Sequence, residues 1–273
     1  MKFTKMQGSG NDFVVIDDRG NEFLGRESEL GIKLCNRHFG IGGDGVLIIR
    51  KSNIAQIKMV IINSDGSNAS MCGNGIRCFA KYIWENDIVR DSVVKIETGD
   101  GVKEVFLDIG KSGVERITVN MGTPSFKPRE IPARFADEIV DKQIEINGKN
   151  YKITSLFMGV PHTVIFGELE KYHVEEGKSI EKCPVFPQGT NVNFCEILDK
   201  NNIEVKTWER GAGPTLACGT GSCACVAAAN KLNLTGKKVK VKVPGGNIWV
   251  EIKGRSVFMT GLAEICFKGE YDI

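Results

Sequence analysis

Two cysteines that each precede an expected helix, Cys72 and Cys218, lie 146 positions apart in this chain. A slightly larger offset, about 150, aligns the strand-like residues 13–16 with residues 163–166. A drifting offset is what surface insertions produce between two copies of one structural unit. The sequence therefore predicts two similar halves, each of which presents one cysteine at the start of a helix.

The helix expected after Cys72 is amphipathic. Its apolar residues recur with the period of one helical face, at Ile76, Phe79, Ala80, Ile83 and Trp84. Arg77, Lys81 and Glu85 occupy the opposite, polar face. The helix expected at residues 222–232 is apolar all round, which predicts burial at the centre of its half. A thiol at a helix N-terminus lies where free N–H groups and the positive dipole end favour a thiolate and bind carboxylates.

The composition excludes several classes of protein. The chain has 273 residues, 41% hydrophobic and 26% charged, with a net charge of +2, which is ordinary for a globular protein and gives no electrostatic case for nucleic-acid binding. No apolar run is long enough to span a bilayer, and the N-terminus lacks the apolar core of a signal peptide. We therefore expect a cytoplasmic protein. Its nine scattered cysteines indicate buried or reactive thiols more than a disulfide framework.

Strand patterns outnumber helix patterns, so the fold class is α+β and not a repeated βαβ unit. Residues 2–6 and 13–17 predict a hairpin, and Asn147-Gly148 predicts the turn of another. Three of the eight prolines fall within residues 122–143, which we interpret as the junction between the halves. The expected domains are residues 1–121 and 122–262.

Two thiols suit one particular reaction. A carbon acid flanked by ammonium and carboxylate groups can be inverted without a cofactor by two bases on opposite faces, one removing a proton and the other returning one. The unperturbed pKa of a thiol lies close enough to working pH for both roles. Backbone N–H groups at both helix starts would hold the substrate carboxylate and stabilise the developing negative charge; the residues supplying them are Gly73, Asn74, Gly219 and Thr220.

Other polar residues are weaker candidates on their own. Glu209 and Arg210 end an expected strand, and such a pair is commonly a surface ion pair. The 146-residue offset matches Glu209 to Asn63, however, which places both at the mouth of one cleft and favours a role with a thiol proton or with charged substrate groups. If Glu209 serves one of the two thiols, His162 is a candidate for polarising the second.

The remaining cysteines have simpler interpretations. Cys78, Cys223 and Cys225 lie inside the helices and are expected to be packing residues. A zinc site from Cys218, Cys223 and Cys225 is disfavoured, because there is no Cys-x2-Cys pair. A different class of function is a redox-sensing protein in which Cys72 and Cys218 form a reversible disulfide.

Two long, ordered motifs resemble the cysteine signatures of the diaminopimelate epimerase family. The first comprises Asn63, Asp65, Gly66, Ser67, Cys72, Gly73, Asn74, Gly75 and Arg77, and the second comprises Glu209, Arg210, Gly211, Gly213, Ala217, Cys218, Gly219 and Gly221. The likeness covers essentially the whole chain, from Gly8 and Asn11 onward. It implies two pseudo-symmetric domains, each a curved, mostly antiparallel sheet around a central helix, with the active site between them and residues 263–273 returning to the first domain.

The resemblance also implies a function and roles for individual residues. The family interconverts LL- and meso-diaminopimelate, for lysine and cell-wall precursors, without a cofactor or metal, and as a homodimer. Cys72 and Cys218 match its acid/base pair, with His162 and Glu209 as helpers that set thiol protonation. The positions that recognise the amino acid are Asn11, Asn63, Asn191, Glu209 and Arg210, and the carboxylate cradle is Gly73, Asn74, Gly219 and Thr220.

Two residues depart from the family pattern. Val160 stands where the family often has Asn, and Gly45 where many members have Gln, and both lost groups are polar substrate contacts. Asn63, Asn191 and Arg210 remain, which favours a substrate with a charged distal end. The alternative within enzymes is a racemase of the same fold acting on another amino acid such as proline.

Overall fold

The computed structural model describes residues 1–273, which divide into two compact units. Unit 1 comprises Met1–Asn120 and Thr260–Ile273, and unit 2 comprises Met121–Met259. No helix is both long and apolar enough to cross a membrane.

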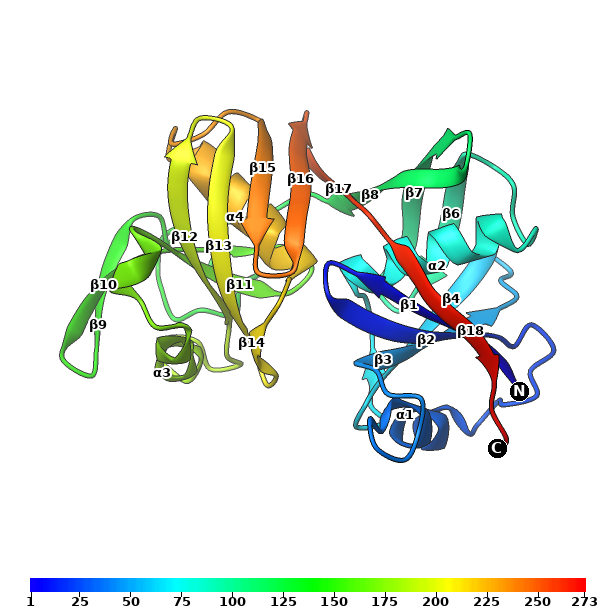
Figure 1. Ribbon diagram of the computed structural model, residues 1–273. Helices are drawn as coiled ribbons and strands as arrows, with labels where there is room; N and C mark the ends of the chain where they lie inside the picture. The colour runs from blue at the N-terminus through cyan, green and yellow to red at the C-terminus, as the bar shows by residue number, and fades with distance from the viewer. The chain divides into compact units, whose positions relative to one another are not determined.

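Unit 1 is a mixed sheet with two helices (Figure 1). Its elements in chain order are β1 (Lys2–Gly8), β2 (Asn11–Asp17), α1 (Glu27–Cys35), β3 (Gly45–Arg50), β4 (Ile57–Asn63), β5 (Asn68–Ala69), α2 (Gly73–Glu85), β6 (Val93–Thr98), β7 (Gly101–Gly110), β8 (Gly113–Gly122) and β18 (Glu264–Glu270). The strands pair in the order β1-β2-β3-β4-β6-β7, where β2–β3 and β4–β6 are parallel and the others antiparallel. The C-terminal strand β18 pairs antiparallel with β1.

Unit 2 repeats this pairing. Its elements are β9 (Lys142–Ile146), β10 (Lys149–Phe157), β11 (Pro161–Phe166), the 3-10 turns η1 (Leu169–Lys171) and η2 (Val174–Glu176), α3 (Gly177–Glu181), β12 (Asn191–Asp199), β13 (Asn202–Glu209), β14 (Gly213–Thr215), α4 (Gly219–Lys231), β15 (Lys238–Val243), β16 (Gly246–Lys253) and β17 (Ser256–Gly261). The order is β10-β11-β12-β13-β15-β16, with β11–β12 and β13–β15 parallel. The short strands β5 and β14 occupy equivalent places, against β4 and β13. The expected duplication is therefore a repeat of topology as well as of motif.

Each unit wraps its sheet around one helix. Helix α2 contacts β1, β2, β4 and β7, and α4 contacts β10, β11, β12, β13 and β16, so each helix touches both ends of its pairing order. Six flat strands would span about 24 Å, roughly twice the diameter of a helix, so the sheet must curve to reach it from both ends. This confirms the expected α+β class with a central helix in each half.

The apolar sequence of β3 follows from helices on both of its faces. Val46 and Ile48 pack in a core cluster with Leu30 and Leu34 of α1. On the opposite face, a Cβ placed on Gly75 of α2 would lie 3.2 Å from Cδ2 of Leu47. All six residues of β3 are buried, because neither face meets solvent.

Local predictions in unit 2 are also confirmed. Asn147 and Gly148 both have positive φ, 52° and 76°, as a two-residue hairpin turn requires. Helix α4 is buried from Gly221 to Ala229, as its all-apolar sequence predicts.

Candidate active site

Cys72 is the N-cap of α2. Its backbone is extended, with φ −140° and ψ 118°, and its Sγ accepts the Gly75 N–H at 3.3 Å. Gly73, Asn74 and Gly75 form the buried first turn. Glycine at position 75 permits this close fit, since a Cβ there would lie 3.3 Å from Cβ of Cys72 and 3.4 Å from Cζ of Phe13. Cys72 is therefore held where backbone N–H groups and the helix dipole favour its thiolate.

Cys218 has the same arrangement in unit 2. It is the N-cap of α4, with φ −107° and ψ 112°, and its Sγ accepts the Gly221 N–H at 3.3 Å. The Thr220 hydroxyl lies 3.4 Å from the same sulfur. Cys218 is 6% exposed, whereas Cys72 is partly exposed. A hydroxyl and an N–H can both donate to the charged form of this sulfur, which opposes the effect of burial on a Cys218 thiolate.

In unit 1, the predicted recognition residues gather at one end of the sheet. Gly45 pairs with Phe13 on β2 and with Asn63 on β4, so the start of β2, the start of β3 and the end of β4 are adjacent. The Asn63 amide donates to Ser67 Oγ at 2.9 Å. The Oδ1 of Asn11 is buried without a hydrogen-bond partner, which leaves it available for a donor from a ligand.

A cluster of charges fixes this end of the sheet. Asp12 accepts from Lys5 at 2.6 Å and from Arg37 at 2.7 Å, and Arg37 also donates to Asp44 at 2.8 Å. Burial opposes ionisation of Asp12, but hydrogen bonds from Arg37 and Lys5 prevail and hold the pKa of this carboxyl well below its usual value. The backbone of Asp44 bonds to Asp12 O and accepts from Ser64 N, so the cluster ties together the segments that carry Asn11, Gly45 and Asn63.

In unit 2, Asn191 links two other predicted residues. Its Nδ2 donates to Pro161 O at 2.9 Å, and its Oδ1 accepts the Arg210 N–H at 2.9 Å. It also lies opposite His162 in the parallel pair β11–β12. The structure thus shows Asn191 positioning the segments on either side of it. Burial lowers the pKa of His162 to about 3, with Arg210 adding to the shift, so the imidazole is neutral at working pH.

Glu209 and Arg210 each have a hydrogen-bond partner elsewhere in unit 2. Glu209 Oε1 accepts from the Thr215 hydroxyl at 2.7 Å, and Arg210 Nη1 donates to Gln188 O at 2.8 Å. Gly189 allows Arg210 to pack closely, because a Cβ there would lie 3.0 Å from its Cδ.

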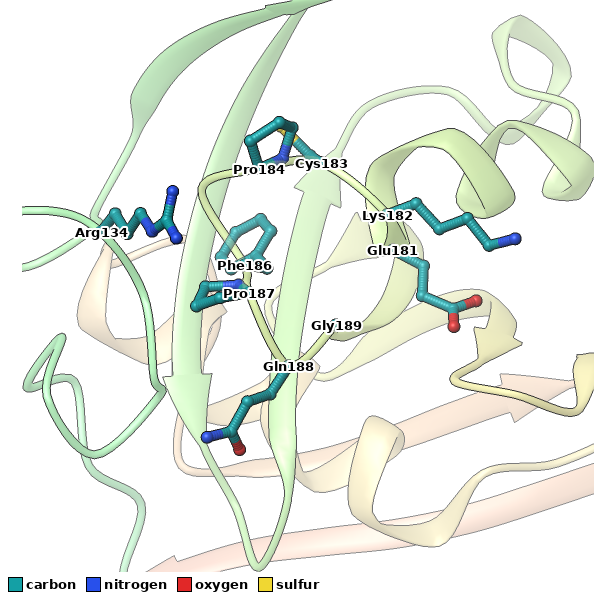
Figure 2. A pocket seen from close by; sticks show the side chains of 9 residues that line it. All are labelled: Arg134, Glu181, Lys182, Cys183, Pro184, Phe186, Pro187, Gln188 and Gly189. Carbon is teal, nitrogen blue, oxygen red and sulfur yellow. The ribbon is translucent and has the colours of Figure 1, made fainter.

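The segment that anchors Arg210 also lines an open cavity of about 540 Å³ (Figure 2). Its lining residues are Arg134, Glu181, Lys182, Cys183, Pro184, Phe186, Pro187, Gln188 and Gly189, and none of them is a predicted site residue. The segment between α3 and β12 carries most of them, with Arg134 on a separate stretch of chain. We therefore do not interpret this hollow as the reacting site.

The prediction that Arg77 lies on the polar face of its helix is wrong. Arg77 is 0% exposed, and its guanidinium donates to Gly73 O, Leu262 O and Ser9 Oγ at 3.0–3.1 Å. The segment preceding β18 covers it, and a Cβ on Gly261 would lie 2.8 Å from its Nε. Periodicity alone could not show this burial, because the covering residues are 185 positions away.

Sequence reasoning also missed Asn193 and Thr207. Asn193 is 0% exposed and bonds to His162, Thr163 and Thr207, while a Cβ on Gly221 would lie 2.4 Å from its Oδ1. It therefore joins His162 to the turn that carries Cys218. A signal was present, because Asn193 follows Asn191 by two positions and shares its strand face.

Comparison with known proteins supplies the family. The family model for diaminopimelate epimerase matches residues 3–127 and 154–266. The diaminopimelate epimerase of Clostridium perfringens is 59% identical over 271 residues, covering 99% of each chain, and that of Caldanaerobacter subterraneus is 45% identical over the whole of both.

Solved structures show the same fold at low identity. A probable proline racemase from Agrobacterium radiobacter K84 has a TM-score of 0.75 at 15% identity and covers 100% of this chain and 93% of its own. A PhzF-family phenazine biosynthesis protein from Bacillus anthracis has a TM-score of 0.70 at 14% identity, with coverage of 100% and 99%. These likenesses concern the fold alone. On the matched motifs, the repeated thiol geometry and the identity to curated relatives, this chain belongs to the diaminopimelate epimerase family.

Proposed function

We propose that this protein interconverts LL- and meso-2,6-diaminopimelate by cofactor-independent proton transfer at one α-carbon, for lysine and peptidoglycan precursor synthesis. The observation that carries the proposal is the repeated thiol geometry. Cys72 and Cys218 each cap a 13-residue helix, and each sulfur accepts the N–H three residues on at 3.3 Å. Membership of the family supports the substrate.

In the proposed reaction one cysteine is a thiolate and takes the α-proton, while the other is a thiol and donates a proton to the opposite face. The thiol that loses its proton becomes the base of the reverse reaction. The first turns of α2 and α4, at Gly73-Asn74 and Gly219-Thr220, would bind the α-carboxylate and stabilise the carbanion. His162 and Glu209 would set the protonation of the thiols.

Recognition of the distal end of the substrate is assigned to Asn11, Asn63, Asn191 and Arg210. The buried, unpartnered Oδ1 of Asn11 suits an ammonium or N–H donor, and the exposed guanidinium of Arg210 suits a carboxylate. Gly45 contributes no side chain, and a Cβ there would lie 2.8 Å from Ile62 O. Glycine at position 45 therefore lets β4 approach β3 closely. In the proposal, the amides of Asn11, Asn63 and Asn191 carry recognition of the distal end.

Deuterium exchange tests the proposal. Reduced protein is incubated in D2O with LL-diaminopimelate, and separately with proline and other amino acids, without added cofactor. Deuterium at the α-carbon of diaminopimelate, together with formation of the meso isomer, is the expected result. Exchange with another amino acid alone would keep the mechanism and overturn the substrate, whereas no exchange with any of them would favour the redox-dithiol alternative.

The location and assembly of the protein are part of the proposal. A thiol/thiolate pair needs a reducing compartment, which supports the cytoplasm. The family resemblance supports a homodimer. Fractionation of producing cells tests the first, and sedimentation velocity of the purified chain tests the second, with a single monomeric species as the contrary result.

A further inference from the structure

One nitrogen of a fully buried histidine has no partner. Nε2 of His162 is buried and makes no hydrogen bond within the chain, whereas Nδ1 lies 3.2 Å from Nδ2 of Asn193. A buried polar atom with no partner costs free energy, so such an atom at a site is retained for a purpose or meets its partner in a ligand-bound state. Which ring nitrogen carries the proton decides what His162 can do.

The surroundings of Asn193 fix the orientation of its amide. One end lies 3.3 Å from the carbonyl oxygen of Thr163, which can only accept, so this end is the amide nitrogen. The other end accepts from the Thr207 hydroxyl at 3.1 Å. The opposite orientation would place two oxygen acceptors against each other at Thr163.

The orientation of Asn193 in turn fixes the tautomer of His162. The amide nitrogen has only protons to offer, so Nδ1 of the ring must accept, and the proton of the neutral imidazole lies on Nε2. Protonation of Nδ1 would bring two donors together at 3.2 Å. Burial and the charge of Arg210 also disfavour the imidazolium.

We propose that Asn193 is a positioning residue that holds His162 as the Nε2–H tautomer, so that His162 serves the reaction as a hydrogen-bond donor to an anion and not as a proton acceptor. The anion is a thiolate or a substrate carboxylate. This role in the reaction rests on the proposed function, whereas the tautomer does not. Asn193 also contacts the turn of Gly221, so one side chain sets the imidazole and the loop of Cys218 together.

The tautomer can be measured without substrate. The chain has only three histidines, and His38 and His173 are exposed, so their ring signals can be assigned with the His38→Gln and His173→Gln variants. Long-range ¹H–¹⁵N correlation spectra of the ¹⁵N-labelled full chain distinguish the two neutral tautomers. The expected spectrum shows His162 as Nε2–H, unchanged through the neutral range. A neutral Nδ1–H form, or a ring that titrates near pH 6.5, would overturn the proposal.

Asn193→Asp reverses the hydrogen bond. A carboxylate at this position accepts from Nδ1–H, which moves the lone pair to Nε2 and favours the imidazolium. The expected results are an altered ring spectrum, a new pH dependence of exchange in the neutral range, and a roughly ten- to hundredfold loss of turnover, the value of one hydrogen bond to a charged group. Asn191→Asp is the matched control for the ring spectrum alone, because it adds the same charge on the same strand face without replacing the amide that contacts Nδ1.

Comparing the variants tests the positioning role of Asn193 separately from the proposed epimerase function. An unchanged ring spectrum in Asn193→Asp would overturn the positioning role, as would an equal change in Asn191→Asp. The expected tautomer without any turnover of diaminopimelate would remove the proposed function and leave the tautomer assignment intact. If Asn193→Asp fails to fold, the wild-type spectrum still decides the tautomer. The wild-type protein is then titrated with a thiol-blocking reagent and, separately, with diaminopimelate. A shift of the Nε2–H signal with the blocking reagent indicates a thiolate partner, and a shift with diaminopimelate indicates a substrate carboxylate.

Discussion

Replacing Gly221 by alanine adds one methyl group beside Cys218, and the equivalent change beside Cys72 is Gly75→Ala. The two glycines hold equivalent places in their helices, yet their surroundings differ. A Cβ at Gly221 would lie 2.4 Å from Oδ1 of Asn193 and 3.2 Å from Sγ of Cys218. A Cβ at Gly75 would meet nothing nearer than Cδ2 of Leu47, at 3.2 Å. The first clash cannot be relieved without moving a buried, hydrogen-bonded amide, whereas the second needs only a small shift of a leucine methyl.

The expected magnitudes follow from these contacts. Displacing Asn193 disturbs its bonds to His162, Thr163 and Thr207, at a cost of about 1–3 kcal/mol for each buried group left unsatisfied. Helix propensity returns at most about 1 kcal/mol. We therefore expect Gly221→Ala to lower the free energy of unfolding by about 2–4 kcal/mol and the Tm by on the order of 10 °C. Gly75→Ala should remain within about 1 kcal/mol of the wild type, because its gain in propensity offsets a tight contact.

Thermal unfolding of the two variants, side by side with the wild type, measures this difference. Alkylation of the native protein with peptide mapping then compares the reactivity of Cys218 and Cys72, and we expect only the Cys218 rate to change in Gly221→Ala. Equal Tm values for the two variants, with unchanged Cys218 reactivity, would refute the inference that Asn193 is held rigidly under the first turn of α4.

Three further results are expected. Cys72→Ala and Cys218→Ala should each abolish epimerisation measured by deuterium exchange. Cys78→Ala should largely retain it, because Cys78 is a buried packing residue. Full activity in either active-site variant would exclude the two-base mechanism. Val160→Asn should tighten diaminopimelate binding or leave it unchanged in calorimetry, and a large loss of activity would mean that the site is built for a different distal group. Asp12→Asn should lower the free energy of unfolding by about 1–3 kcal/mol at neutral pH, because an amide cannot replace the carboxylate between the cations of Lys5 and Arg37. Since the pKa of Asp12 is depressed in the folded state, its contribution is fully present above its usual pKa of 3.8. The contribution is lost progressively as pH falls from that value toward the depressed pKa of the folded state, so the stabilities of variant and wild type should approach each other in acid. A difference that persists unchanged at low pH would contradict this.

The sequence by itself determined the duplicated α+β plan and the two capping cysteines. Both depend on local signals. Cys72 and the glycines after it mark the start of one helix, and an unbroken apolar run predicts the burial of α4. These signals survive in sequence because helix capping and periodicity involve residues within one or two turns of each other.

Only the tertiary structure decided the environment of the polar side chains. Arg77 falls on the polar side of its helix by periodicity, but a segment 185 residues away buries it. Asn193 contacts His162 and Thr207 only because β12 lies between β11 and β13 in a particular register. The pKa of His162 depends on the same packing. Burial and hydrogen bonding are set by contacts between distant strands, which a local pattern does not encode, and so the chemical state of a site residue is a property of the folded chain.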